Sequence, residues 1–139
     1  MSAPSTTHRV QMRWRDIDGL GHVNHAVALT YLEEGRDRFL AQHGIARDEY
    51  VVGSCTLRFR GEIDPGQDAV TIECRLDQLG NASFSTSERI VSDAGDVVVE
   101  AEFGLVLWDR ARRASRPLTA EERASMEGVA PSPAEGAEA

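Results

Sequence analysis

The polar residues that could perform chemistry gather in the segment Asp16-Ile-Asp-Gly-Leu-Gly-His-Val-Asn-His25. Asp18 is a carboxylate that could attack a carbonyl or activate a water molecule, and His22, Asn24 and His25 add hydrogen-bonding groups beside it. A helical pattern begins where this segment ends, and a helix N-terminus presents unpaired N–H groups and a partial positive charge. An oxyanion that develops during the attack could be stabilised there.

Two other interpretations of this segment compete with catalysis. Aspartates in a loop before a helix are more often turn-formers and caps than catalysts. His22, His25 and Asp18 could suggest a metal site, but no third His or Cys stands at ligand spacing, so no metal is predicted. The chain also lacks a Gly-x-Ser-x-Gly elbow, a phosphate-binding loop and a dinucleotide glycine fingerprint, which excludes several enzyme classes.

One strand and one long helix must position the segment. Period-two alternation predicts a half-buried strand over residues 9–15, and three- and four-residue spacing predicts a helix over 26–43. We expect Asn24 to cap this helix and Gly44 to end it. Gly35 is unfavourable inside a helix by about 1 kcal/mol relative to alanine. We therefore expect it to permit close packing against other backbone.

The rest of the chain is rich in strands joined by tight turns. Alternation predicts strands over residues 51–59, 69–77, 83–91 and 97–108. The first of these is expected to place Val51, Cys55, Leu57 and Phe59 on one face, and both Cys55 and Cys74 to be buried free thiols. Thr119 is expected to cap a short helix. One helix followed by antiparallel strands predicts an α+β domain with the helix against a curled five-stranded sheet. A second copy of the chain should cover the other face or an edge.

Composition limits the class of protein. The chain has 139 residues, with 15 basic residues, all arginine, and 23 acidic ones, giving a net charge of −8. That length suits one domain, expected over residues 1–127, and residues 128–139 have the composition of a disordered tail. An acidic chain is a poor candidate for binding nucleic acid or an anionic membrane. Without a signal sequence or an apolar span, a cytoplasmic location is the default expectation.

The segment from Trp14 to His25, followed by Tyr31-Leu-Glu-Glu-Gly-Arg36, resembles the hotdog-fold thioesterases of the 4-hydroxybenzoyl-CoA thioesterase and acyl-CoA thioesterase type. Gly80-Asn-Ala-Ser-Phe84 and Arg116-Pro-Leu118 are also similar, so the resemblance covers roughly residues 9–127. It implies a five-stranded antiparallel sheet wrapped around one long central helix. It further implies hydrolysis of an acyl-CoA thioester, with coenzyme A present as part of the substrate and no separate cofactor.

The resemblance also implies roles for single residues. Asp18 matches the catalytic carboxylate of the family, as nucleophile or general base, and the backbone N–H of His25 matches the group that polarises the thioester carbonyl. Asn24 and His22 match orienting positions of the family's His-Val-Asn run. A homodimer or homotetramer with shared active sites is expected.

Coenzyme A is a polyanion, so an acidic chain needs a local basic site to bind it. Two arginine groups are candidates, Arg58 with Arg60 and Arg113 with Arg116, because guanidinium groups suit bidentate phosphate contacts. Solvated basic turns without a ligand are the alternative for both groups.

Two further functions compete with acyl-CoA hydrolysis. The first is hydrolysis of acyl-carrier-protein thioesters in fatty-acid or polyketide synthesis, where an acidic partner protein would dock on arginines. The second is non-catalytic binding of acyl-CoA by a sensor, which usually carries a DNA-binding module that this chain has no residues left to build.

Overall fold

The computed structural model describes residues 3–128. The expected tail therefore lies almost wholly outside the described residues. The elements follow in the order β1 (Ser5–Gln11), η1 (Trp14–Asp16), α1 (His25–Ala41), β2 (Tyr50–Phe59), β3 (Ala69–Leu79), β4 (Ser83–Val91), β5 (Val97–Asp109), β6 (Ala114–Ser115) and α2 (Ala120–Met126).

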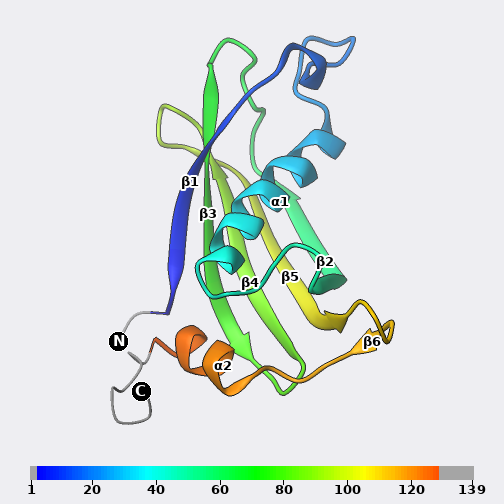
Figure 1. Cartoon of the computed structure of the whole chain (residues 1–139). Helices are drawn as coiled ribbons and strands as arrows, with labels where there is room; N and C mark the ends of the chain where they lie inside the picture. Colours follow the sequence, from blue (N-terminus) through cyan, green and yellow to red (C-terminus); the bar gives the residue numbers. More distant parts are fainter. Residues whose placement is uncertain (1–2, 129–139) are drawn as a thin grey trace.

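Five strands form one antiparallel sheet in the order β1-β3-β4-β5-β2, and the short β6 pairs with β5. The long helix α1 lies across one face of this sheet and contacts β1, β3 and β4 (Figure 1). Since β1 and β2 occupy the two edges, each has one side without a strand partner in the described chain. The predicted α+β class and the sheet wrapped around one central helix are confirmed.

Alternation of side chains explains the core between α1 and the sheet. Even-numbered residues over 70–76 of β3 and 84–90 of β4, and odd-numbered residues over 99–107 of β5, face the helix and are buried. They pack on the apolar face of α1 (Tyr31, Leu32, Phe39 and Leu40), each of which is fully buried. The predicted caps are also present: the Asn24 side chain accepts from the Ala26 N–H, and Gly44 follows α1 with a φ of +77°.

Three details of the sequence interpretation were wrong. The first strand ends at Gln11, and Trp14 lies in a 3-10 turn with 87% of its surface exposed. A β-bulge between Val52 and Ser54 shifts the register of β2, so Val51 pairs with Val106 and faces away from Phe59. Cys55 is exposed, because it lies on the edge strand β2, away from α1, which packs mainly on β1, β3 and β4, whereas Cys74 on β3 is buried.

Gly35 marks the closest approach of α1 to the sheet. A Cβ placed at this glycine would clash with Cγ2 of Ile72 on β3 and lie 2.8 Å from its Cβ. The close packing predicted for Gly35 is therefore present, but it is made against a side chain of the sheet and not against backbone.

A buried ion pair joins the middle of α1 to β4. Arg36 donates from Nε and Nη2 to the two carboxylate oxygens of Glu88 at 2.8 and 3.1 Å, and both residues are at most 2% exposed. The Thr86 hydroxyl donates to the same carboxylate at 2.6 Å, and the Arg36 guanidinium lies 3.8 Å from the centre of the Phe103 ring. Burial opposes the charge of Arg36, but Glu88 outweighs it and raises the pKa of Arg36.

Candidate functional site

Residues 16–24 form a small hairpin that ends at the N-terminus of α1. The Asn24 N–H donates to the Asp16 carbonyl at 3.0 Å, and the Asp18 N–H donates to the His22 carbonyl at 2.7 Å. Ile17 and Val23 form an antiparallel bridge between these two bonds. Glycines at 19 and 21 allow the tight tip, where Gly21 has a φ of +81°. The loop predicted from composition is therefore an ordered hairpin.

Asp18 lies immediately before the tip of this hairpin and is partly exposed. Its Oδ1 accepts hydrogen bonds from the Leu20 N–H at 2.9 Å and the His22 N–H at 3.1 Å. Its Oδ2 accepts no hydrogen bond from any described residue. The bond from His22, and then that from Leu20, hold the pKa of the Asp18 carboxyl below its ordinary value, and the charges of His22 and His25 act in the same direction. Asp18 is therefore an ionised carboxylate with one oxygen held and one available.

The N-terminus of α1 begins directly after the hairpin. Asn24 caps it, because its Oδ1 accepts from the Ala26 N–H at 2.8 Å and its carbonyl accepts from the Val27 N–H at 3.0 Å. The His25 N–H, at the first helical position, donates to no acceptor in the described chain. It is one of the N–H groups that a helix start leaves unpaired, and it can donate to a developing oxyanion.

Side chains from β2 and the loop after it border the hairpin. The His25 ring packs on Phe59, with ring centroids 4.5 Å apart, and His22 Nε2 lies 2.9 Å from Oε1 of Glu62. The surface here is apolar and open: Leu20 is 80% exposed and Phe59 is 45% exposed. Of the predicted site residues, the structure therefore brings Asp18, His22, Asn24 and His25 together.

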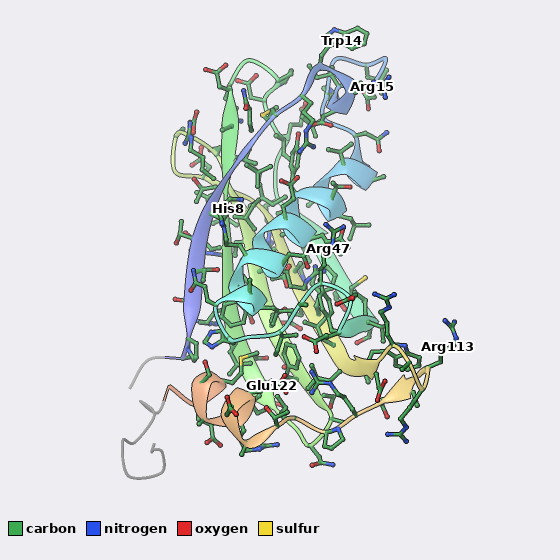
Figure 2. The ribbon with its side chains drawn as sticks, in the orientation of Figure 1. His8, Trp14, Arg15, Arg47, Arg113 and Glu122 are labelled. Carbon is green, nitrogen blue, oxygen red and sulfur yellow. The ribbon has the colours of Figure 1, made fainter. Side chains whose placement is uncertain are left out.

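The four predicted arginines do not join this group within one chain. Arg58 and Arg60 follow the outer face of the sheet, where Arg60 donates to Glu100 at 2.8 Å and Arg58 lines a shallow cavity of about 560 Å³. Arg116 is engaged by Glu122 through two hydrogen bonds of 2.8 and 2.9 Å. Arg113 lies in the turn between β5 and β6, at the opposite end of the molecule from Trp14 and Arg15 beside the hairpin (Figure 2).

Sequence reasoning gave no role to the contact that anchors the hairpin. Asp16 is buried, and its Oδ2 accepts from the Tyr31 hydroxyl at 2.5 Å and from the Arg13 N–H at 2.9 Å. Tyr31 lies in the helical pattern of the sequence, and it is fully buried. A signal was present in the sequence, since a buried tyrosine hydroxyl needs a partner and Asp16 is an acidic residue shortly before the helix.

Neither a metal cluster nor a membrane-spanning helix is found in residues 3–128. No three His, Cys, Asp or Glu side chains in this part of the chain are grouped so that they could hold a metal ion. Neither described helix is long and apolar enough to cross a membrane.

Comparisons with known proteins agree with the fold. A sequence profile of the thioesterase-like superfamily matches residues 12–135. A thioesterase from Thermus thermophilus, solved with coenzyme A and Zn, superposes with a TM-score of 0.75 at 29% identity, covering 87% of this chain and 95% of that one. A 1,4-dihydroxy-2-naphthoyl-CoA thioesterase from Synechocystis superposes with a TM-score of 0.76 at 16% identity, covering 88% and 95%. No curated protein matches the chain by sequence.

One helix across a five-stranded antiparallel sheet, together with the match to a solved thioesterase, places the chain among the hotdog-fold thioesterases. Because the family profile spans most of the sequence, the protein belongs to the thioesterase-like superfamily. It is a thioester hydrolase.

Proposed function

We propose that the protein hydrolyses acyl-CoA thioesters to a free acid and coenzyme A, with Asp18 as the catalytic carboxylate and no cofactor besides the coenzyme A of the substrate. One observation carries this proposal. The hairpin holds Asp18 by Oδ1, leaves Oδ2 available, and ends at the unpaired N–H of His25. A carboxylate and an oxyanion donor in adjoining positions are the two groups that hydrolysis of a carbonyl compound requires.

The reaction follows from these two groups. As a general base, Asp18 accepts a proton from water while the water oxygen bonds to the thioester carbon. The carbonyl oxygen becomes an oxyanion that accepts a hydrogen bond from the His25 N–H. Collapse of this intermediate breaks the C–S bond. The proton on Asp18 then passes to the departing thiolate. As a nucleophile, Asp18 would instead bond to the thioester carbon and expel the thiolate as the C–S bond breaks, giving an acyl anhydride. Water then hydrolyses the anhydride to the free acid and the restored carboxylate, and the proton released passes to the thiolate. Both routes use the same Oδ2.

A second copy of the chain would supply the phosphate-binding arginines that the site lacks within one chain. The edge strand β2 exposes apolar side chains, with Val52 46% and Phe59 45% exposed, and an unpaired edge favours antiparallel pairing with another copy. β2 has ten residues, about 33 Å of extended chain. Its first residue, Tyr50, pairs with Leu107 beside the arginine turn at 109–113, and its last, Phe59, contacts His25. Antiparallel pairing of two β2 edges would bring the arginine turn of one copy to the Asp18 hairpin of the other.

Thiol release from a panel of acyl-CoA substrates tests the activity. The panel covers short, medium and long aliphatic acyl groups and an aromatic one, each matched by the same acyl group on a carrier protein. We expect thiol release with kcat/KM at least about tenfold higher for the acyl-CoA of the best pair, a difference of about 1.4 kcal/mol in transition-state binding.

Two outcomes would contradict acyl-CoA hydrolysis. Preference for the carrier-protein thioester would identify the alternative substrate class. Tight binding of acyl-CoA without thiol release would identify a binding protein.

Mixed oligomers test whether the arginine turn acts across two copies. Arg112→Ser/Arg113→Ser is expected to raise KM for acyl-CoA about tenfold and to leave the N-acetylcysteamine thioester, which has no phosphates, unaffected. Coexpression with Asp18→Asn should restore activity at low acyl-CoA concentration, because one of the two sites in the mixed dimer then has both an intact Asp18 and an intact arginine turn. Arg58→Ser/Arg60→Ser serves as the comparison. The shared site is wrong if KM rises in Arg58→Ser/Arg60→Ser and not in Arg112→Ser/Arg113→Ser. It is also wrong if the mixed oligomers recover no activity at low acyl-CoA concentration.

A further inference from the structure

The hairpin that carries Asp18 is attached to α1 at two points. One is covalent, since Asn24 is both the last hairpin residue and the cap of the helix. The other is a side-chain contact between the first hairpin residue and the second turn of α1, where the Tyr31 hydroxyl donates to Asp16 Oδ2 at 2.5 Å. Because Asp16 and Asn24 are hydrogen-bonded to each other at the base of the hairpin, these two attachments hold both of its strands.

The contact between Tyr31 and Asp16 is shielded from solvent. Tyr31 is fully buried and Asp16 is 7% exposed. Burial, and then the bond to Asp16, raise the pKa of Tyr31, so its hydroxyl stays protonated and remains a donor at neutral pH. The same Oδ2 also accepts the Arg13 N–H at 2.9 Å, which ties the chain that enters the hairpin to the same point.

We infer that Tyr31 and Asp16 are positioning residues, whose contact sets where the Asp18 carboxylate lies relative to the His25 N–H. The inference rests on the proposed function. Neither residue touches the substrate in this scheme. Without the Tyr31 hydroxyl, the hairpin keeps its covalent attachment at Asn24 and can pivot about it. A displacement of about 1 Å at a reacting group is enough to lower a rate by about 100-fold.

The test is Tyr31→Phe, assayed on the best acyl-CoA substrate. We expect kcat to fall about 10- to 100-fold with KM changed less than about threefold, because the binding groups for the coenzyme lie elsewhere. A looser hairpin also holds the Leu20 and His22 N–H groups less firmly on Asp18. The acid limb of the pH–rate profile should therefore move to higher pH, towards the ordinary range of an aspartate.

A matched control separates positioning from loss of stability. Thr86→Val removes another buried hydroxyl, one that donates to Glu88 at 2.6 Å beneath the middle of α1, and it leaves the side chain the same size. This variant is expected to lower Tm while kcat and the acid limb stay as in the wild type. An equal loss of kcat in Thr86→Val, or an unchanged kcat in Tyr31→Phe, would overturn the inference.

Asp16→Asn covers the case in which Tyr31→Phe does not fold. An asparagine keeps one oxygen to accept the Tyr31 hydroxyl, and we expect a smaller loss of kcat, less than about tenfold, with KM unchanged. Loss of kcat equal to that of Asp18→Asn would instead place Asp16 in the reaction and contradict the inference. Failure of the proposed function has a different signature, because the wild type would then release no thiol or a folded Asp18→Asn would retain full activity.

Discussion

Asp18→Asn is expected to lower kcat at least about 100-fold while the protein stays folded, since a positioned general base or nucleophile contributes a factor of this order or more. Asparagine keeps the Oδ1 that accepts the Leu20 and His22 N–H groups, so the hairpin retains its turn. The substitution removes only the charge and basicity of the available oxygen. Thiol release under saturating acyl-CoA measures the effect, with Asp93→Asn, at an exposed ion pair with Arg9, as the control.

The role of Asp18 also predicts how activity depends on pH. The reaction needs the ionised carboxylate, and the hydrogen bonds from His22 and Leu20 lower the pKa of Asp18. Over the pH range in which the protein stays folded, activity should therefore be lost only below the ordinary aspartate pKa of about 3.9. A limb near pH 6, or full activity in a folded Asp18→Asn, would show that another group is the base.

Breaking the buried ion pair is expected to give the largest loss of stability. Glu88→Ala removes both acceptors of Arg36 and leaves a guanidinium with no carboxylate in the core beneath α1. An uncompensated buried charge costs about 3–5 kcal/mol, which should lower Tm by roughly 10–20 °C in a domain of this size. Thermal or urea unfolding followed by circular dichroism measures the change.

Two comparisons make this prediction specific to burial. Glu73→Ala breaks an exposed pair in which Arg89 Nε donates to Glu73 at 2.8 Å, and it should cost no more than about 1 kcal/mol. The double variant Arg36→Met/Glu88→Met replaces both charges by apolar side chains of similar length, and it should be more stable than Glu88→Ala. If Glu88→Ala and Glu73→Ala lose equal stability, the buried pair has no special role.

Much of the fold could be predicted because its elements follow simple periods. Strands β3, β4 and β5 were predicted within two residues of their ends, since side chains alternate along most of each strand. The register shift in β2 could not be predicted, because a bulge depends on the partner strand and not on local alternation. Exposure of Cys55 escaped prediction for the same reason: strand order decides which apolar strand becomes an edge.

The core also contains charges that periodicity could have revealed. Arg36 falls on the apolar face of α1 beside Leu32 and Phe39. Glu88 lies between Thr86 and Ile90 on the inward face of β4. Each was an isolated charge on a buried face. Only the packing of helix on sheet shows that the two are partners.

The candidate site was predictable in part. Four of its residues lie close together because they are near one another along the chain, so a local motif was sufficient to group them. The contact of Tyr31 with Asp16 spans fifteen positions and depends on how the hairpin folds back on the helix. The arginines could not be assigned from sequence, because Arg113 lies at the opposite end of the molecule from Trp14 and Arg15, which precede the hairpin that carries Asp18 (Figure 2).

The contact between Gly35 and Ile72 makes a prediction about relatives of this protein. Even an alanine at 72 would keep a Cβ within 2.8 Å of a Cβ at 35, so shrinking the sheet residue as far as alanine does not make room for a side chain on the helix. A relative with a larger residue at the position of Gly35 must therefore hold its helix farther from its sheet. Superposition of homologous structures should show that the distance between the helix and the sheet increases with the size of this one residue. The residue type at this position would then predict that distance from the sequence of a relative.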